Sequence, residues 1–355
     1  MKVYGLVNTG MEKVARQEII ELFQKKPLSH PRVLEVDLTT EETITLLTRG
    51  QSFRRLLIGF GKGGEVQQIP LEKIPFRDFF FPESKFKIEV EGVKGQDNRF
   101  DLARNLAGRL FPLIEKNIKV HLELKKPQLL VVVFHNDQNF FVGVDLAGKE
   151  LNARFYRVFP HQASFKGDLG YYLTRKSGFA AGKKLVVGFM KDGVMAIEAA
   201  IFANKYWVRD PWKENFSCLS FPRWQGLSLS KPSPGAFIVD AFDENTQNFT
   251  AARKNAQIAG VDKNLHIQKI ALDELDVRYD KGSVDQLIFH LTAKDEDKIN
   301  EIFHQAIYIL KKKGILVLIS RKSFEVSSGS NFTVMEREEI VRGESPLLVW
   351  VLRKG

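Results

Sequence analysis

The sequence predicts an α/β protein whose carboxyl-terminal part is a doubly wound parallel sheet. From about residue 160 to the end, short apolar runs alternate with helical patterns, which is typical of parallel strands covered by helices. Within residues 182–204, an apolar strand is followed by a turn containing Gly188 and Gly193 and then by an Ala- and Ile-rich helix. Because such a turn brings the backbone and a helix N-terminus close to a ligand, it predicts a nucleotide-like cofactor there.

The composition is typical of a globular protein with two or three domains, at 355 residues, 44% of them apolar and 27% charged. No run of about 18 apolar residues and no signal-peptide pattern is present, so we expect a cytoplasmic protein without a membrane segment. The single cysteine, Cys218, excludes a disulfide framework and a thiolate zinc site, and no metal-ligand spacing stands out.

The net charge of +10 favours a polyanionic partner over a merely well-solvated surface. Lysine and arginine that neutralise phosphates supply most of the non-specific affinity of proteins for nucleic acids. The charge therefore predicts a nucleic-acid-binding protein.

Two α/β units are predicted before the doubly wound part. Residues 1–65 read as strand, helix, strand, helix and strand, with Thr40 as the cap of the second helix, and this order suits a small ferredoxin-like domain. Residues 66–158 read as a strand, a helix over 101–116 and then mostly strands.

The third predicted unit, residues 159–355, is Rossmann-like. Its candidate parallel strands are residues 185–188, 236–240, 265–270, 286–289 and 314–320, and residues 331–338 and 345–352 form a terminal antiparallel pair. Residues 205–234 are an insertion rich in Trp and Pro, and insertions of this kind often build substrate or partner surfaces.

Several segments together resemble one known family. Residues 142–151, Val-Gly-Val-Asp-Leu-Ala-Gly-Lys-Glu-Leu, precede Arg154-Phe155-Tyr156-Arg157 and His161-Gln162-Ala163. This run resembles the junction between a THUMP domain and the catalytic domain of class I RNA methyltransferases. Residues 8–12, 197–200 and 252–261 are similar to the family's start and to its helices after the first two strands.

The resemblance covers nearly the whole chain and implies three parts. It implies a ferredoxin-like domain over 1–65, a THUMP-like RNA-binding domain over 66–158, and a Rossmann-like methyltransferase domain over 159–355. In that family the cofactor is S-adenosylmethionine, the product is N2-methylguanine and the substrate is tRNA or rRNA.

The chain departs from the family in two motifs. When the glycine-rich cofactor motif is placed on residues 187–200, Val187 stands at the acidic position and Lys191 at the first glycine. The target-base motif, Asn or Asp followed by two prolines and an aromatic residue, is replaced by His290-Leu291-Thr292-Ala293. The stiff proline turn and the acceptor for the guanine amino group are therefore missing.

Candidate cofactor-binding residues are Gly188, Gly193 and Asp243. Val187 and Lys191 favour reading the glycines as a tight turn without a ligand, and Asp243 either accepts from ribose hydroxyls or caps a helix. Catalytic residues are unknown, with Asp285 and His290 as candidates. His290 is a general base or a hydrogen-bonded histidine at a strand end.

Basic side chains in the first two units and at the junction are candidates for phosphate contacts. They are Arg99, Arg104, Lys125, Arg154, Arg157 and Lys166. We expect an RNA-binding family member whose cofactor and target-base motifs have degenerated. The alternatives are an active S-adenosylmethionine-dependent RNA methyltransferase and a non-catalytic scaffold that presents RNA to a partner enzyme, which it binds through residues 205–234.

Overall fold

The computed structural model describes residues 1–233, 235–292, 295–322, 331–342 and 345–355. The chain forms two compact units. The first contains residues 1–7, 15–151 and 209–230, and the second contains residues 8–14, 152–208 and 231–355. Each unit has its own mixed sheet and helices, so the predicted α/β class is confirmed. None of the helices in these described ranges is long and apolar enough to cross a membrane.

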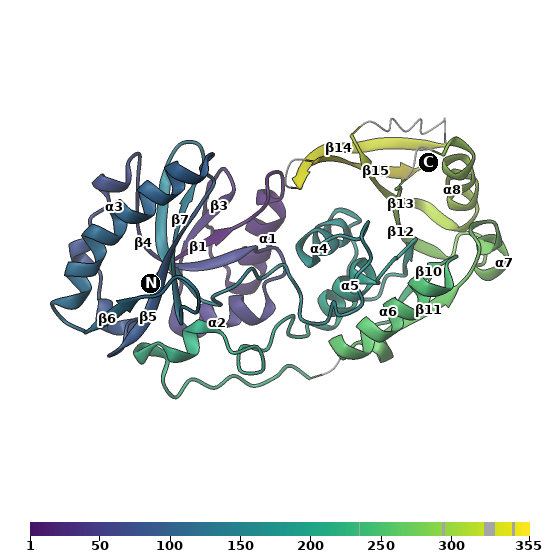
Figure 1. The fold of residues 1–355 in the computed structure, drawn as a ribbon. Helices are drawn as coiled ribbons and strands as arrows, with labels where there is room; N and C mark the ends of the chain where they lie inside the picture. Colours follow the sequence, from purple (N-terminus) through teal and green to yellow (C-terminus); the bar gives the residue numbers. More distant parts are fainter. Residues whose placement is uncertain (234, 293–294, 323–330, 343–344) are drawn as a thin grey trace. The chain divides into compact units, whose positions relative to one another are not determined.

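The first unit is built on an eight-stranded sheet in the order β2-β3-β1-β4-β8-β7-β5-β6 (Figure 1). Its strands are β1 Lys2–Leu6, β2 Leu28–His30, β3 Val33–Asp37, β4 Arg55–Gly63, β5 Ser84–Glu91, β6 Val120–Leu122, β7 Leu129–His135 and β8 Phe140–Asp145. Its helices are α1 Glu12–Phe23, whose first three residues group with the second unit, α2 Thr40–Arg49 and α3 Gln96–Glu115.

A single strand pair joins the two halves of this sheet. β4 runs antiparallel to β8, with Leu57 opposite Asp145 and Ile58 opposite Val144. The strands of residues 1–65 and those of residues 66–158 therefore belong to one continuous hydrogen-bonded sheet. The division of this unit into a ferredoxin-like and a THUMP-like domain stays a prediction.

The cap of α2 differs from the prediction by one residue. Thr39, not Thr40, is the N-cap: its hydroxyl accepts a hydrogen bond from Glu42 N, and the Glu42 carboxylate accepts one from Thr39 N. The sequence has two adjacent threonines, Thr39 and Thr40, and either could be the cap. Only Thr39 lies three residues before Glu42, which is the spacing that a capping box requires.

A buried carboxylate links three strands of the first unit. The side chain of Glu35 on β3 is 6% exposed, and its oxygens lie 2.6 Å from Lys2 Nζ and 2.6 Å from Lys62 Nζ. Burial tends to raise the pKa of Glu35, but the hydrogen bonds from Lys2 and Lys62 outweigh burial and lower the pKa to about 2.

Glu35 should therefore make the protein acid-sensitive. Its folded-state pKa lies below its unfolded value, so its stabilisation is complete above pH 4.5 and is lost as the pH falls toward about 2. The loss should be about 3 kcal/mol. Urea unfolding at a series of pH values measures this loss. Below pH 4.5, the free energy of unfolding should fall less steeply for Glu35→Gln than for the wild type, whereas Glu115→Gln, at an exposed position, should follow the wild type.

The second unit contains a seven-stranded sheet in the order β11-β10-β9-β12-β13-β15-β14. Its strands are β9 Leu185–Gly188, β10 Val239–Asp243, β11 Leu265–Lys269, β12 Val284–His290, β13 Leu310–Arg321, β14 Phe332–Arg342 and β15 Ser345–Lys354. Its helices are α4 Gly167–Lys176, α5 Val194–Asn204, α6 Thr246–Ala259, α7 Leu275–Arg278 and α8 Glu296–Ile309 (Figure 1). The first five strands are parallel and β15 and β14 are antiparallel, which confirms the Rossmann-like prediction.

One local prediction in this unit is wrong, and one helix was not predicted. The strand predicted at 236–240 begins at Val239, and the apolar side chains of Phe237 and Ile238 before it are 41% and 58% exposed. Helix α4 was not predicted, because its polar and glycine residues hide the apolar stripe that packs against α5.

The insertion does not form a continuous surface of its own. Its residues 209–230 group with the first unit, and Phe216, Cys218, Phe221 and Trp224 are buried in that unit's core. The aromatic residues that suggested a binding surface are therefore largely core residues.

Candidate functional site

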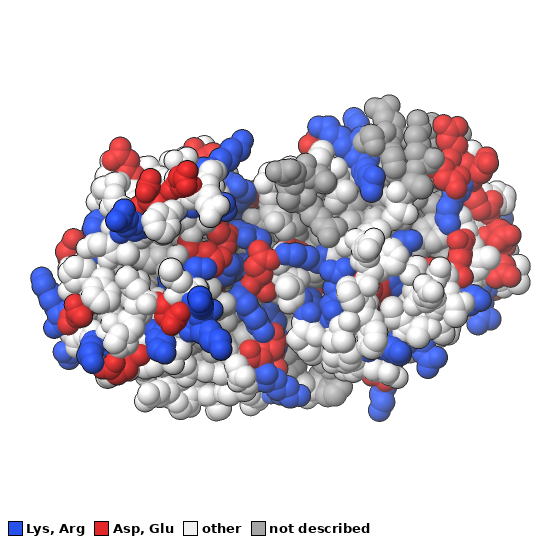
Figure 2. Space-filling view, viewed as in Figure 1, with Lys and Arg blue, Asp and Glu red and all other residues white. Residues whose placement is uncertain are grey.

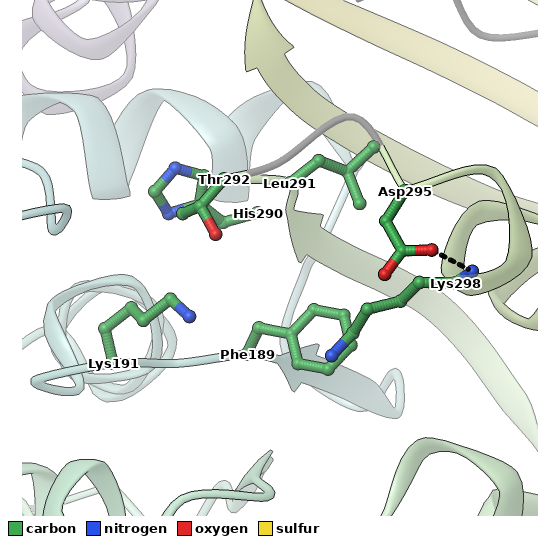
Figure 3. Close-up of a pocket in the computed structure, with 7 residues that line it drawn as sticks. All are labelled: Phe189, Lys191, His290, Leu291, Thr292, Asp295 and Lys298. Carbon is green, nitrogen blue, oxygen red and sulfur yellow. Dashed lines mark hydrogen bonds between the residues drawn. The ribbon is translucent and has the colours of Figure 1, made fainter.

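The candidate site lies where the order of the parallel strands reverses in the second unit. β9 and β12 are neighbours, with Gly188 opposite Phe289, and the chain leaves them toward α5 and α8. Ligands of open α/β sheets bind at this switch point, beyond the carboxyl ends of the strands. A pocket of about 180 Å³ occurs there (Figure 3). It is lined by Phe189, Lys191, His290, Leu291, Thr292, Asp295 and Lys298.

Both glycines of the turn are required by packing against protein atoms. A Cβ on Gly188 would lie 2.2 Å from Cε1 of Phe289. Gly193, the N-cap of α5, has a φ of +86°, and a Cβ there would lie 2.9 Å from Cβ of Ala252. The glycines are therefore explained without a ligand close to the backbone.

Aromatic side chains fill the space behind the turn. Phe189 is buried, although its φ of +52° is unusual for a residue with a side chain. Its ring centroid lies 5.9 Å from that of Phe242 and 5.5 Å from that of Phe289. This cluster belongs to the core of the second unit and narrows the pocket from the sheet side.

Asp243 ends β10 and is buried, with hydrogen bonds to both carboxylate oxygens. Oδ2 accepts from Lys191 N at 3.0 Å, while Oδ1 accepts from Asn245 N at 3.0 Å and from Asn248 Nδ2 at 3.0 Å. The carboxylate thus holds the glycine turn and the start of α6. A ribose hydroxyl would have to compete with these three donors.

The two catalytic candidates lie at opposite ends of β12. His290 is its last residue, lines the pocket and stacks at a tilt on Phe165, with 4.1 Å between ring centroids. Asp285 lies near its start, about 17 Å away at the rise of an extended strand. Asp285 accepts a hydrogen bond from Lys184 N and pairs with Lys311, so it is not part of this site.

A buried ion pair supports the turn from the other side of α5. Glu198 Oε1 accepts from Arg154 Nε at 2.7 Å and from the Tyr156 hydroxyl at 2.6 Å, and Oε2 accepts from Arg154 Nη2 at 2.9 Å. Burial lowers the pKa of Arg154, but the charge of Glu198 outweighs burial and raises it. Burial and the charge of Glu198 both raise the pKa of Tyr156.

A second network connects the junction to the turn itself. Asp192 is buried and accepts from Arg157 Nε at 2.7 Å, from His161 N at 3.1 Å and from the Ser164 hydroxyl. The Asn255 amide donates to the Asp192 carbonyl oxygen at 2.9 Å. The junction and helix motifs that suggested the family are therefore one connected buried structure.

The six predicted RNA-binding residues fall into two groups. Arg99, Arg104 and Lys125 in the first unit are exposed. Arg154 is fully buried against Glu198, so we remove it from the proposed RNA-binding set. Arg157 pairs with Asp192, and Lys166 is half-buried at the N-cap of α4.

The sequence gives no signal for the pocket residue Lys298, because it lies in no motif, and it shows Thr292 only within the segment that replaces the target-base motif. Over the described ranges, no cluster of three or more His, Cys, Asp or Glu side chains is arranged to hold a metal ion.

The strand order, the glycine turn and the switch-point site define the class of protein as a Rossmann-like methyltransferase fold. TrmN from Thermus thermophilus has a TM-score of 0.73 at 16% identity, over 100% of this chain and 99% of that one. SMU.472, a putative methyltransferase complexed with SAH, has a TM-score of 0.76 at 15% identity, over 99% and 97% of the two chains. The profile of the RMKL-like methyltransferase domain family matches residues 154–331, and the chain belongs to that family.

Curated relatives are also similar to this chain. A ribosomal RNA large subunit methyltransferase K/L from Alteromonas mediterranea is 23% identical over 71% of this chain and 39% of its own length. A tRNA (guanine(6)-N2)-methyltransferase from Archaeoglobus fulgidus is 22% identical over 46% of this chain and 40% of its own length. The match therefore spans about two fifths of these relatives.

The site does not fit S-adenosylmethionine in the way that the family resemblance requires. The expected ribose acceptor, Asp243, is already bound by three donors, and the turn is packed against Phe289 and Ala252. A volume of about 180 Å³ is also small beside the roughly 300–1,000 Å³ of most small-molecule sites.

Proposed function

We propose that this chain is an RNA-binding member of the RMKL-like methyltransferase family whose cofactor site no longer accepts S-adenosylmethionine. The observation that carries the proposal is the turn after β9. There the Phe189 ring packs against the rings of Phe242 and Phe289, and the Asp243 carboxylate accepts hydrogen bonds from other groups of the protein. Together these features leave little room for an adenosyl group, and only about one lone-pair site of Asp243 for its ribose hydroxyls.

The RNA part of the proposal rests on the relatives and on charge. Both curated relatives are named as RNA methyltransferases, and this chain has a net charge of +10. Lys and Arg are interspersed with Asp and Glu on the face in Figure 2. Binding would therefore depend on particular exposed residues, and Arg99, Arg104 and Lys125 are the best placed. Because ribosomal and transfer RNAs are the proposed ligands, we propose a cytoplasmic location.

Replacing two exposed arginines on α3 should weaken RNA binding. In Arg99→Ala/Arg104→Ala, affinity for tRNA and rRNA fragments should fall regardless of sequence, because phosphate contacts carry no base information. The slope of log affinity against log salt should become shallower by about two, one for each lost contact. Filter binding at several salt concentrations measures both quantities.

The matched control is Lys263→Ala/Lys269→Ala, which removes the same charge from exposed positions of the second unit. It should leave the slope unchanged. Equal effects of the two double variants would show that RNA binding depends on the net charge and not on Arg99 and Arg104. Absence of RNA binding by the wild type would contradict the proposed function itself.

An active S-adenosylmethionine-dependent RNA methyltransferase is the second candidate. The complete sheet order and the fold similarity to a putative methyltransferase complexed with SAH favour it. It requires the aromatic cluster to open and Asp243 to accept from the ribose in addition to its protein donors. The scaffold alternative lacks the apolar surface that motivated it, since residues 209–230 bury most of their aromatic side chains.

A further inference from the structure

The turn after β9 contains a lysine in a conformation that glycine adopts without strain. Lys191 has a φ of +56°, in the left-handed region that other residues rarely occupy. Such strain persists where the surrounding structure or a function requires the residue, and it is a reason to look for a role. Phe189, at a φ of +52°, has a packing role in the core, whereas Lys191 is only half-buried.

The Lys191 ammonium group points into the pocket (Figure 3). It forms no salt bridge with any carboxylate that the structure describes, and its Nζ lies 6.0 Å from the centroid of the Phe189 ring. The strained lysine therefore presents a positive charge to the pocket.

A second lysine also lies near the Phe189 ring. Lys298 Nζ lies 4.1 Å from the Phe189 centroid and 2.8 Å from Glu244 Oε2. Asp295 also lines the pocket, but its Oδ1 is held at the start of α8, where it accepts from Lys298 N at 3.0 Å. Glu244 and Asp295 together balance the charge of the two lysines, so the positive charge available to a ligand is that of Lys191, which forms no salt bridge with a described residue.

We propose that this pocket binds a phosphate-type anion in place of the family's cofactor. Lys191 and Lys298 supply ammonium donors, and the Thr292 hydroxyl points toward them from the β12 side (Figure 3). The Phe189 ring forms an apolar wall that limits water on one side, which strengthens the charge interactions. A volume of about 180 Å³ accommodates a phosphate group but is small for a whole nucleotide cofactor.

The proposal does not depend on RNA binding. Free phosphate, the phosphate of a nucleoside monophosphate and an RNA backbone phosphate share the same chemistry, and each would contact the same two lysines. On binding, Lys298 would share its charge between Glu244 and the anion.

Calorimetric titrations of the wild type with inorganic phosphate, adenosine 5′-monophosphate, adenosine and a short single-stranded RNA test the proposal at constant ionic strength. Phosphate should bind with a millimolar or lower Kd, and adenosine should not bind at this pocket. Lys191→Gly, which also relieves the backbone strain, should weaken binding of the phosphate-bearing probes at least tenfold.

Lys205→Gly is the matched control, because Lys205 has the same φ of +56° but caps the end of α5 outside the pocket. It should keep wild-type binding, and Lys191→Arg should retain most of it. If Lys191→Gly weakens the binding of RNA alone, the ligand is a backbone phosphate of RNA. If it also weakens the binding of inorganic phosphate, the ligand is free phosphate. Equal binding of every probe by wild type and Lys191→Gly would overturn the proposal, as would adenosine binding as well as its monophosphate.

Discussion

Glu198→Ala is expected to lower the free energy of unfolding of the second unit by about 3–5 kcal/mol. The change leaves the Arg154 guanidinium fully buried without its anion, and the Tyr156 hydroxyl without its acceptor. Breaking one partner of a buried ion pair costs more than the pair contributes, because the remaining charge stays desolvated. Urea unfolding, followed by hydrogen exchange of the α5 amides, measures the loss.

A double variant separates charge desolvation from simple loss of packing. Arg154→Met/Glu198→Leu removes both charges and retains apolar volume, so it should be more stable than Glu198→Ala. If its loss of stability equals the sum of the losses in Arg154→Met and Glu198→Leu, the pair is not energetically coupled.

Arg55→Met is expected to destabilise the first unit by a similar amount, about 3–5 kcal/mol. The guanidinium of Arg55 is buried and bonds three carboxylates: Asp145 at 2.9 Å, Glu89 at 2.8 Å and Glu91 at 2.6 Å. Burial raises the pKa of Asp145 and Arg55 opposes that rise, so removing the arginine leaves a buried acid with only backbone donors.

Arg223→Met is the matched control in the same unit. Arg223 pairs with Asp78 at 2.7 Å, but its side chain is 43% exposed and that of Asp78 is 33% exposed. An exposed pair contributes at most about 1 kcal/mol, so the loss should stay below that value. If Arg55→Met and Arg223→Met lower the free energy of unfolding equally, burial of the ion pair does not determine the cost of breaking it.

The scaffold of the second unit was predictable because strand spacing and helix composition are local properties. The family motifs at the junction and in α5 were also recognisable, but their contacts were not. Glu198 is the single acid of the otherwise apolar helix α5, and although a buried carboxylate needs a cationic partner, no such pairing was predicted. That this cation is Arg154, 44 positions away, follows only from the packing of the junction.

The candidate site was predictable in position but not in content. Gly188 and Gly193 lie in the predicted turn and Asp243 at the end of the neighbouring strand β10, yet the side chains around them come from strands and helices distant in sequence. Phe289 fills the space beside Gly188, and the Asn248 side chain donates a hydrogen bond to Asp243. Arg154 looked like a surface cation because the sequence does not show that Glu198 is buried against it. In each case tertiary contacts decide a role that local pattern leaves open.

Titration of the purified protein with S-adenosylmethionine, coupled to a methyl-transfer assay on tRNA and rRNA, tests the central claim most directly. We predict no binding tighter than about 1 mM, which corresponds to only about 4 kcal/mol of binding free energy, and no methylated RNA. Micromolar binding of S-adenosylmethionine together with methyl transfer to either RNA would contradict the claim and establish the chain as an active enzyme.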